Sequence, residues 1–76
     1  MPTLLRLNGF KFFFYANDHE PPHVHILKAE RWAKIEIKSA QVVYSSLKAQ
    51  ELRECLQILE AHRNEFLEKW YDWFNR

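Results

Sequence analysis

The sequence predicts an α+β fold in which an antiparallel meander of four or five short strands packs on one long C-terminal helix. Residues 3–44 consist of short, strand-like apolar runs separated by turn residues. From residue 45 onward, apolar side chains recur at helical spacing with no Gly or Pro between them. A chain of 76 residues makes one small core, so we expect residues 1–76 to form a single domain.

The first two strands are expected at residues 3–7 and 10–15, on either side of Asn8-Gly9. This dipeptide is a strong hairpin signal because both of its residues tolerate positive φ. Phe10, Phe12 and Phe14 point to one side of the second strand, and Phe13 and Tyr15 point to the other. Because both faces are apolar, we expect one to meet the helix and the other to meet a partner or a second copy of the chain.

Three further runs complete the predicted sheet, at residues 23–28, 32–38 and, as a short fifth strand, 41–44. Ser45 or Ser46 is expected to cap the N-terminus of the helix. Cys55 falls among apolar helix positions, which favours a buried structural thiol over a nucleophile.

The composition excludes some classes of function. The formal net charge is +1, so there is no overall positive field to attract nucleic acid. A single cysteine forms no internal disulfide, and no apolar run approaches the roughly 20 residues of a membrane span. We therefore expect a cytoplasmic protein that does not cross a membrane.

The segment Asp18-His19-Glu20-Pro21-Pro22-His23-Val24-His25 holds three of the four histidines. Imidazole donates, accepts and ligates near neutral pH, and the two prolines predict a stiff, extended loop. The fourth histidine, His62, lies on the apolar stripe of the helix and is expected to point towards the sheet. Either these rings converge at the end of the sheet near the prolines, or they form two separate groups on opposite faces.

Converging histidines suit acid/base cleavage of RNA without a metal, in which one ring takes the 2′-hydroxyl proton and another protonates the leaving oxygen. The candidate catalytic residues are His23, His25, His62, Asp18 and Arg63. Cations and aromatic rings suited to phosphate contact and base stacking are Lys28, Arg31, Trp32, Lys34 and Tyr15.

Two alternatives to catalysis by histidine alone stay open. The first is a zinc-like divalent metal, with His19, His23, His25 and His62 as candidate ligands and Asp18 as a further one. Against it, His23 and His25 are about 7 Å apart by strand rise. The second alternative is a binding module without catalysis, in which the histidine loop and the aromatic faces contact another protein.

The chain resembles the small bacterial family of unknown function numbered 4160. The resemblance rests on the Asp-His-x-Pro-Pro-His-x-His core of residues 18–25 together with Met1-Pro2-Thr3, Gly9, Ile35, Leu47, His62-Arg63, Glu65 and Trp70. It covers essentially the whole chain. Lys48 stands where the family commonly has Pro, and Ala40 where it commonly has Gly.

This resemblance implies the toxin half of a two-gene toxin-antitoxin module. The implied partner is a small antitoxin protein of the family of unknown function numbered 2442. The resemblance also marks as candidates the motif positions Asp18, His19, Pro21, Pro22, His23, His25 and His62. It names no biochemical target.

Overall fold

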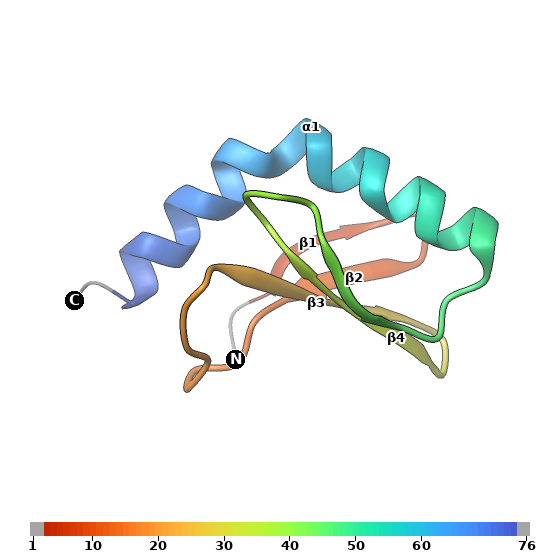
Figure 1. The fold of residues 1–76 in the computed structure, drawn as a ribbon, viewed down its shortest axis with the longest axis horizontal. Helices are drawn as coiled ribbons and strands as arrows, with labels where there is room; N and C mark the ends of the chain where they lie inside the picture. The colour runs from red at the N-terminus through yellow and green to blue at the C-terminus, as the bar shows by residue number, and fades with distance from the viewer. Residues whose placement is uncertain (1–2, 75–76) are drawn as a thin grey trace.

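A five-stranded antiparallel sheet lies against one long helix, which confirms the α+β prediction (Figure 1). The computed structural model describes residues 3–74. Within them the elements are β1 (Thr3–Leu7), β2 (Phe10–Phe13), β3 (His23–Lys28), β4 (Arg31–Glu36), β5 (Val42–Ser45) and α1 (Ala49–Phe74). Each strand pairs with its neighbours in sequence, so the sheet is a simple meander in the order β1-β2-β3-β4-β5.

The β1–β2 connection is the expected Asn8-Gly9 hairpin, with φ of 54° and 82° at its two residues. Lys28, at the end of β3, donates to the Asn8 carbonyl oxygen at 2.6 Å and lies over the Phe10 ring. A side chain at Gly9 would clash with this ammonium, since a Cβ built there lies 2.7 Å from Nζ. Lys28 therefore links the end of β3 to the β1–β2 hairpin.

One face of the sheet forms the core with α1. The side chains of this face and of the helix that are buried together are Leu4, Phe10, Phe12, Phe14, Val24, Ile26, Ala33, Ile35, Ile37, Cys55, Ile58, Leu59, Phe66 and Trp70. Val24 and Ile26 of β3 are fully buried, so side-chain alternation turns His23 and His25 towards the outer face. Burial also raises the pKa of the Cys55 thiol to about 12, as expected for a structural cysteine.

The helix starts later than expected, at Ala49 rather than directly after Ser45 or Ser46. Ser45 instead accepts the Leu47 N–H at 3.0 Å, and the Ser46 hydroxyl bonds to the backbone of Trp32. The helix N-terminus is capped from within by Glu51, whose Oε1 accepts the Lys48 N–H at 2.9 Å. The serines close the turn that precedes the helix.

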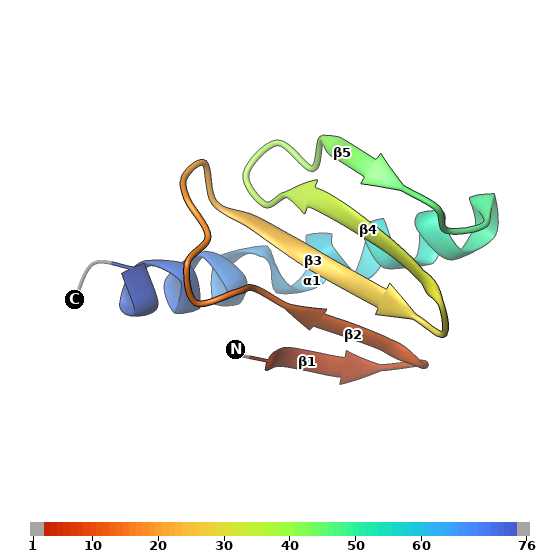
Figure 2. The same ribbon diagram turned by 90° about the horizontal axis from the view of Figure 1, so that it is seen from below.

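The C-terminal half of α1 projects past the end of the sheet, beside the loop between β2 and β3 (Figure 2). Of its aromatic residues, Trp70 is buried, and Tyr71, Trp73 and Phe74 are half-buried against the core. Trp70 is 1 % exposed and packs edge-on against Phe14, while Trp73 donates to the Ala16 carbonyl oxygen at 3.5 Å. Within residues 3–74, no helix combines the length and the apolar character needed to cross a membrane.

Arg31 ties the start of β4 to the first turn of α1. Its Nε and Nη2 donate to the two oxygens of Glu51 at 2.8 and 2.6 Å, a bidentate pair. The Arg31 hydrogen bond is the largest influence that lowers the pKa of Glu51, from the ordinary 4.5 to about 2. This pair therefore stabilises the folded state only while Glu51 is ionised.

We predict that Glu51→Gln lowers the free energy of unfolding at neutral pH, and that the deficit shrinks as pH falls. Because the folded-state pKa is depressed, the stabilisation is complete above about 4.5 and is lost as pH approaches about 2. Urea unfolding of both proteins across this range measures the difference. A deficit that stays constant with pH would contradict the assignment.

Candidate functional site

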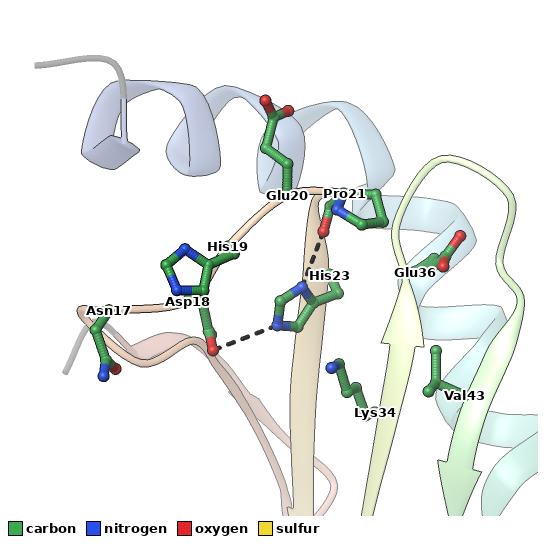
Figure 3. A pocket seen from close by; sticks show the side chains of 9 residues that line it. All are labelled: Asn17, Asp18, His19, Glu20, Pro21, His23, Lys34, Glu36 and Val43. Atoms are coloured by element: carbon green, nitrogen blue, oxygen red, sulfur yellow. Dashed lines mark hydrogen bonds and ion pairs between the residues drawn. The ribbon is translucent and has the colours of Figure 1, made fainter.

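Asp18, His23 and His25 gather where the β2–β3 loop enters β3, and Figure 3 shows the first two of them. One ligand atom from each lies within 4.8 Å of the others, and we call these three residues the rim centre. Within residues 3–74 they are the one group of three His, Cys, Asp or Glu side chains that is close enough to hold an ion. The sequence left convergence open, and in the structure His23 and His25 do converge on one point.

Asp18 lies between the two imidazoles. Its Oδ1 is 3.4 Å from Nε2 of His23, and its Oδ2 is 3.2 Å from Nε2 of His25. The carboxylate is oriented by the turn before it, because Oδ2 also accepts the Tyr15 N–H at 2.8 Å. The Asp18 side chain is only 14 % exposed, so its charge is largely removed from water.

The His23 ring has a defined orientation and tautomer. Its Nδ1 lies 2.9 Å from the Pro21 carbonyl oxygen, which only accepts, so Nδ1 carries the hydrogen (Figure 3). In the neutral ring the lone pair is then on Nε2. This Nε2 is buried and has no hydrogen-bond partner among the described residues, although it faces Asp18. The Trp70 ring, whose centroid is 5.1 Å away, supports the imidazole from the helix side.

His25 is held among aromatic rings on the outer face. Phe13 stacks on it at 5.6 Å between centroids, and Tyr15 meets it edge-on at 4.7 Å. Burial is the largest cause that lowers the pKa of His25, and the nearby charges of His23 and Lys34 add to the lowering while Asp18 opposes it. The contacts of Phe13 with His25 and of the Pro21 carbonyl with His23 were not indicated by the sequence.

The close approach of the two imidazoles corrects the objection based on strand rise. Side chains two residues apart start about 7 Å apart along a strand. The two ring centroids are nevertheless 5.1 Å apart, at an interplanar angle of 83°. Asp18 comes within 3.4 Å of Nε2 of both rings.

A pocket of about 440 Å³ opens beside the rim centre. It is lined by Asn17, Asp18, His19, Glu20, Pro21, His23, Lys34, Glu36 and Val43 (Figure 3). His19 lies on its wall but is not among the three clustered ligands. His23 and Asp18 therefore form part of the wall of a solvent-accessible pocket, although His23 Nε2 itself is buried.

His62 and Arg63 do not join the rim centre, which corrects their expected placement. His62 Nδ1 pairs with Glu65 at 3.1 Å, and its ring stacks on Phe66. The rim centre meets α1 at Trp70, eight positions further on, which is about 12 Å along a helix. Arg63 serves as an anchor, because its Nε donates to the Ile37 carbonyl oxygen at 3.0 Å.

The five expected substrate-binding residues divide into two groups. Lys28 and Arg31 lie at the far end of the sheet and are engaged by Asn8 and Glu51, respectively. The other three, Lys34, Trp32 and Tyr15, lie on the outer face nearer the rim centre: Lys34 lines the pocket, and Tyr15 contacts His25. Trp32 is 43 % exposed and stacks on Tyr44.

The arrangement permits two kinds of chemistry. Paired imidazoles with a carboxylate can move protons on a bound substrate. The same three groups can also bind a cation, since each offers a lone pair to one region of space. Both uses require that His23 keeps its Nδ1 hydrogen on Pro21.

We predict that His23 carries a hydrogen on Nδ1 at every pH at which the protein is folded. The Pro21 carbonyl oxygen, 2.9 Å away, accepts this hydrogen and has none to donate. Two-bond nitrogen-proton correlation spectra of uniformly labelled protein distinguish the ring nitrogens. A His23 ring with an unprotonated Nδ1 would refute the assignment.

The family resemblance expected from the histidine motif is confirmed by comparison with protein families. The family described as Domain of unknown function (DUF4160) matches residues 9–71, a range that includes the whole rim centre and Trp70. Met1 and Pro2, which contributed to the resemblance, lie outside the described residues. The comparisons with curated proteins and with solved structures found no match. The chain therefore belongs to the DUF4160 family.

Proposed function

We propose that this protein is the toxin of a bacterial two-gene module and that it cleaves RNA at the rim centre in the cytoplasm. The observation that supports this most is the gathering of two imidazoles and a carboxylate within 4.8 Å, beside a pocket. Enzymes that transfer protons need an acid and a base close to one point, whereas a histidine with a purely structural role needs no such neighbours.

The surroundings of the rim centre suit a nucleotide chain. Lys34 supplies a cation on the pocket wall, where it can balance the charge of a phosphate. Tyr15, 45 % exposed and adjacent to His25, offers a ring on which a base can stack. Trp32 and Tyr44 extend this aromatic surface along the sheet, with ring centroids 4.3 Å apart. Both contact types are independent of base sequence.

The reaction that fits these groups is a transesterification within the RNA strand. One imidazole removes the proton of a 2′-hydroxyl, whose oxygen then attacks the neighbouring phosphorus. The bond from phosphorus to the 5′-oxygen breaks, and the second imidazole, protonated, gives its proton to that oxygen. The products are a 2′,3′-cyclic phosphate and a free 5′-hydroxyl, with no metal or water consumed.

We predict that His25→Gln lowers the rate of RNA cleavage by about 10²-fold or more, the usual contribution of a general acid or base. The assay measures fragments of single-stranded RNA that end in 2′,3′-cyclic phosphate, with chelator present. His62→Gln is the matched control, because His62 lies outside the rim centre and should leave the rate unchanged.

Two outcomes would contradict this function. Growth arrest on expression, with total RNA intact, would remove the nuclease part of the proposal. Equal loss of cleavage in the two variants would show that the activity does not come from the rim centre.

A second candidate function, binding of an antitoxin protein without catalysis, is favoured by the outer face of the sheet. Four large side chains there, Tyr15, Leu27, Trp32 and Tyr44, are each at least 39 % exposed, and we call them the aromatic patch. Three of them line a common apolar pocket. Exposed aromatic groups of this kind mark interfaces. The partner proposed is a small antitoxin of the family of unknown function numbered 2442, with a second copy of the chain as the alternative.

We predict that Trp32→Ala weakens the complex with this antitoxin about 30-fold, as loss of a central interface tryptophan does. Isothermal titration of the purified proteins gives the affinity, and Arg53→Ala, at an exposed position of α1, is the control. An unchanged affinity in Trp32→Ala would place the interface elsewhere.

A further inference from the structure

The rim centre has an unusual feature that RNA cleavage does not explain. The His23 side chain is only 6 % exposed, yet its Nε2 has no hydrogen-bond partner among the described residues. A buried polar atom without a hydrogen-bond partner destabilises the folded state. The nearest polar group is the carboxylate of Asp18, and in the neutral ring the Nε2 lone pair and the carboxylate oxygen both accept. An electron-pair acceptor placed between them would satisfy both.

Asp18 is within hydrogen-bond reach of His25, but both of its contacts with the imidazoles are long. Charge-assisted N–H···O bonds are about 2.7–2.9 Å long. The two contacts of Asp18 are longer, 3.4 Å to His23 and 3.2 Å to His25. Around a tetrahedral zinc ion with bonds of about 2.0–2.1 Å, neighbouring ligand atoms lie about 3.3 Å apart. The two Asp18 separations are close to this value, and all three ligand atoms lie within 4.8 Å of one another.

We propose that Asp18, His23 and His25 bind a divalent transition metal such as zinc. The ligand atoms are Nε2 of His23, Nε2 of His25 and the carboxylate of Asp18. Two imidazoles and one carboxylate favour zinc, iron, cobalt or nickel over magnesium and calcium, which prefer oxygen ligands. This inference goes beyond the proposed RNA cleavage and does not depend on it.

Each of the three ligand side chains is also oriented by a contact with a neighbouring group, as is common for metal ligands in proteins. His23 donates its Nδ1–H to the Pro21 carbonyl oxygen at 2.9 Å, which leaves Nε2 for the ion. Asp18 accepts the Tyr15 N–H at 2.8 Å. His25 is fixed by its stack on Phe13. Ring rotation is therefore limited, and the site is largely formed before an ion arrives.

Three protein ligands leave at least one coordination position for water or substrate. The pocket beside His23 and Asp18 gives that position access to solvent. Of the candidate ligands that the sequence suggested, Asp18, His23 and His25 belong to this set, and His19 and His62 do not. His19 remains on the pocket wall, and His62 is paired with Glu65.

The test is isothermal titration of Zn²⁺ into untagged, full-length protein that has been stripped with chelator, at neutral pH. We expect one ion per chain in the parent protein and in the control His62→Gln. Asp18→Asn and His25→Gln should each bind about 100-fold more weakly or worse, because even outer-shell partners are worth about 10- to 100-fold. Circular dichroism of each variant checks that it folds.

Two further measurements keep the result decisive. Zn²⁺ should raise the Tm of the parent protein and of His62→Gln but not that of Asp18→Asn. Co²⁺ in place of Zn²⁺ should give the strong visible absorption of a low-coordinate site. No saturable binding by the folded parent protein, or binding that is lost in His62→Gln and kept in Asp18→Asn, would overturn the proposal.

The metal and RNA proposals fail separately. Zinc titration contains no RNA, so its outcome is independent of any nuclease activity. Because a bound ion occupies both ring nitrogens, metal-loaded protein should lose any cleavage that depends on free imidazoles. RNA cleavage with no zinc binding supports the proposed function alone, and zinc binding with no cleavage supports the metal site alone.

Discussion

The packing of β3 on α1 is the constraint on which the site depends. Val24 and Ile26 are both fully buried against the helix, and this fixes the register of the strand. A slip of one residue would bury charged and imidazole groups in the core and expose the apolar ones. With the register fixed, His23 and His25 must share the outer face at the start of the strand. The position of the rim centre is thus a consequence of core packing.

The loop between β2 and β3 completes the site by a second, independent set of contacts. The Pro22 carbonyl oxygen accepts the Ile37 N–H at 3.0 Å, so the loop is attached to the end of β4. Arg63 of α1 donates to the Ile37 carbonyl oxygen on the same residue. Helix, strand end and proline pair are therefore linked through one backbone unit. This linkage explains why Arg63 belongs with the motif although it does not reach the imidazoles.

Nucleic acid and metal ions make different demands on this centre. An anionic phosphate is repelled by Asp18, whereas a cation is attracted by it. For a phosphate bound in the pocket, the positive charge of Lys34 on the wall partly offsets the repulsion by the Asp18 carboxylate. The aromatic patch has no charge preference and can serve a base or a protein partner. The outer face therefore combines a charged end at the prolines with an apolar surface along the strands.

From the sequence alone the meander, the Asn8-Gly9 hairpin, the long C-terminal helix and the clustering of three histidines near the proline pair could be predicted. These features follow from local rules, namely the period of two in strands, the period of 3.6 in helices and the φ preferences of turn residues. Tertiary structure alone decided that Asp18 returns between the imidazoles, that Pro21 sets the His23 tautomer, and that His62 stays apart. Those outcomes depend on the path of a loop and on the point where α1 crosses the sheet, which local periodicity does not specify.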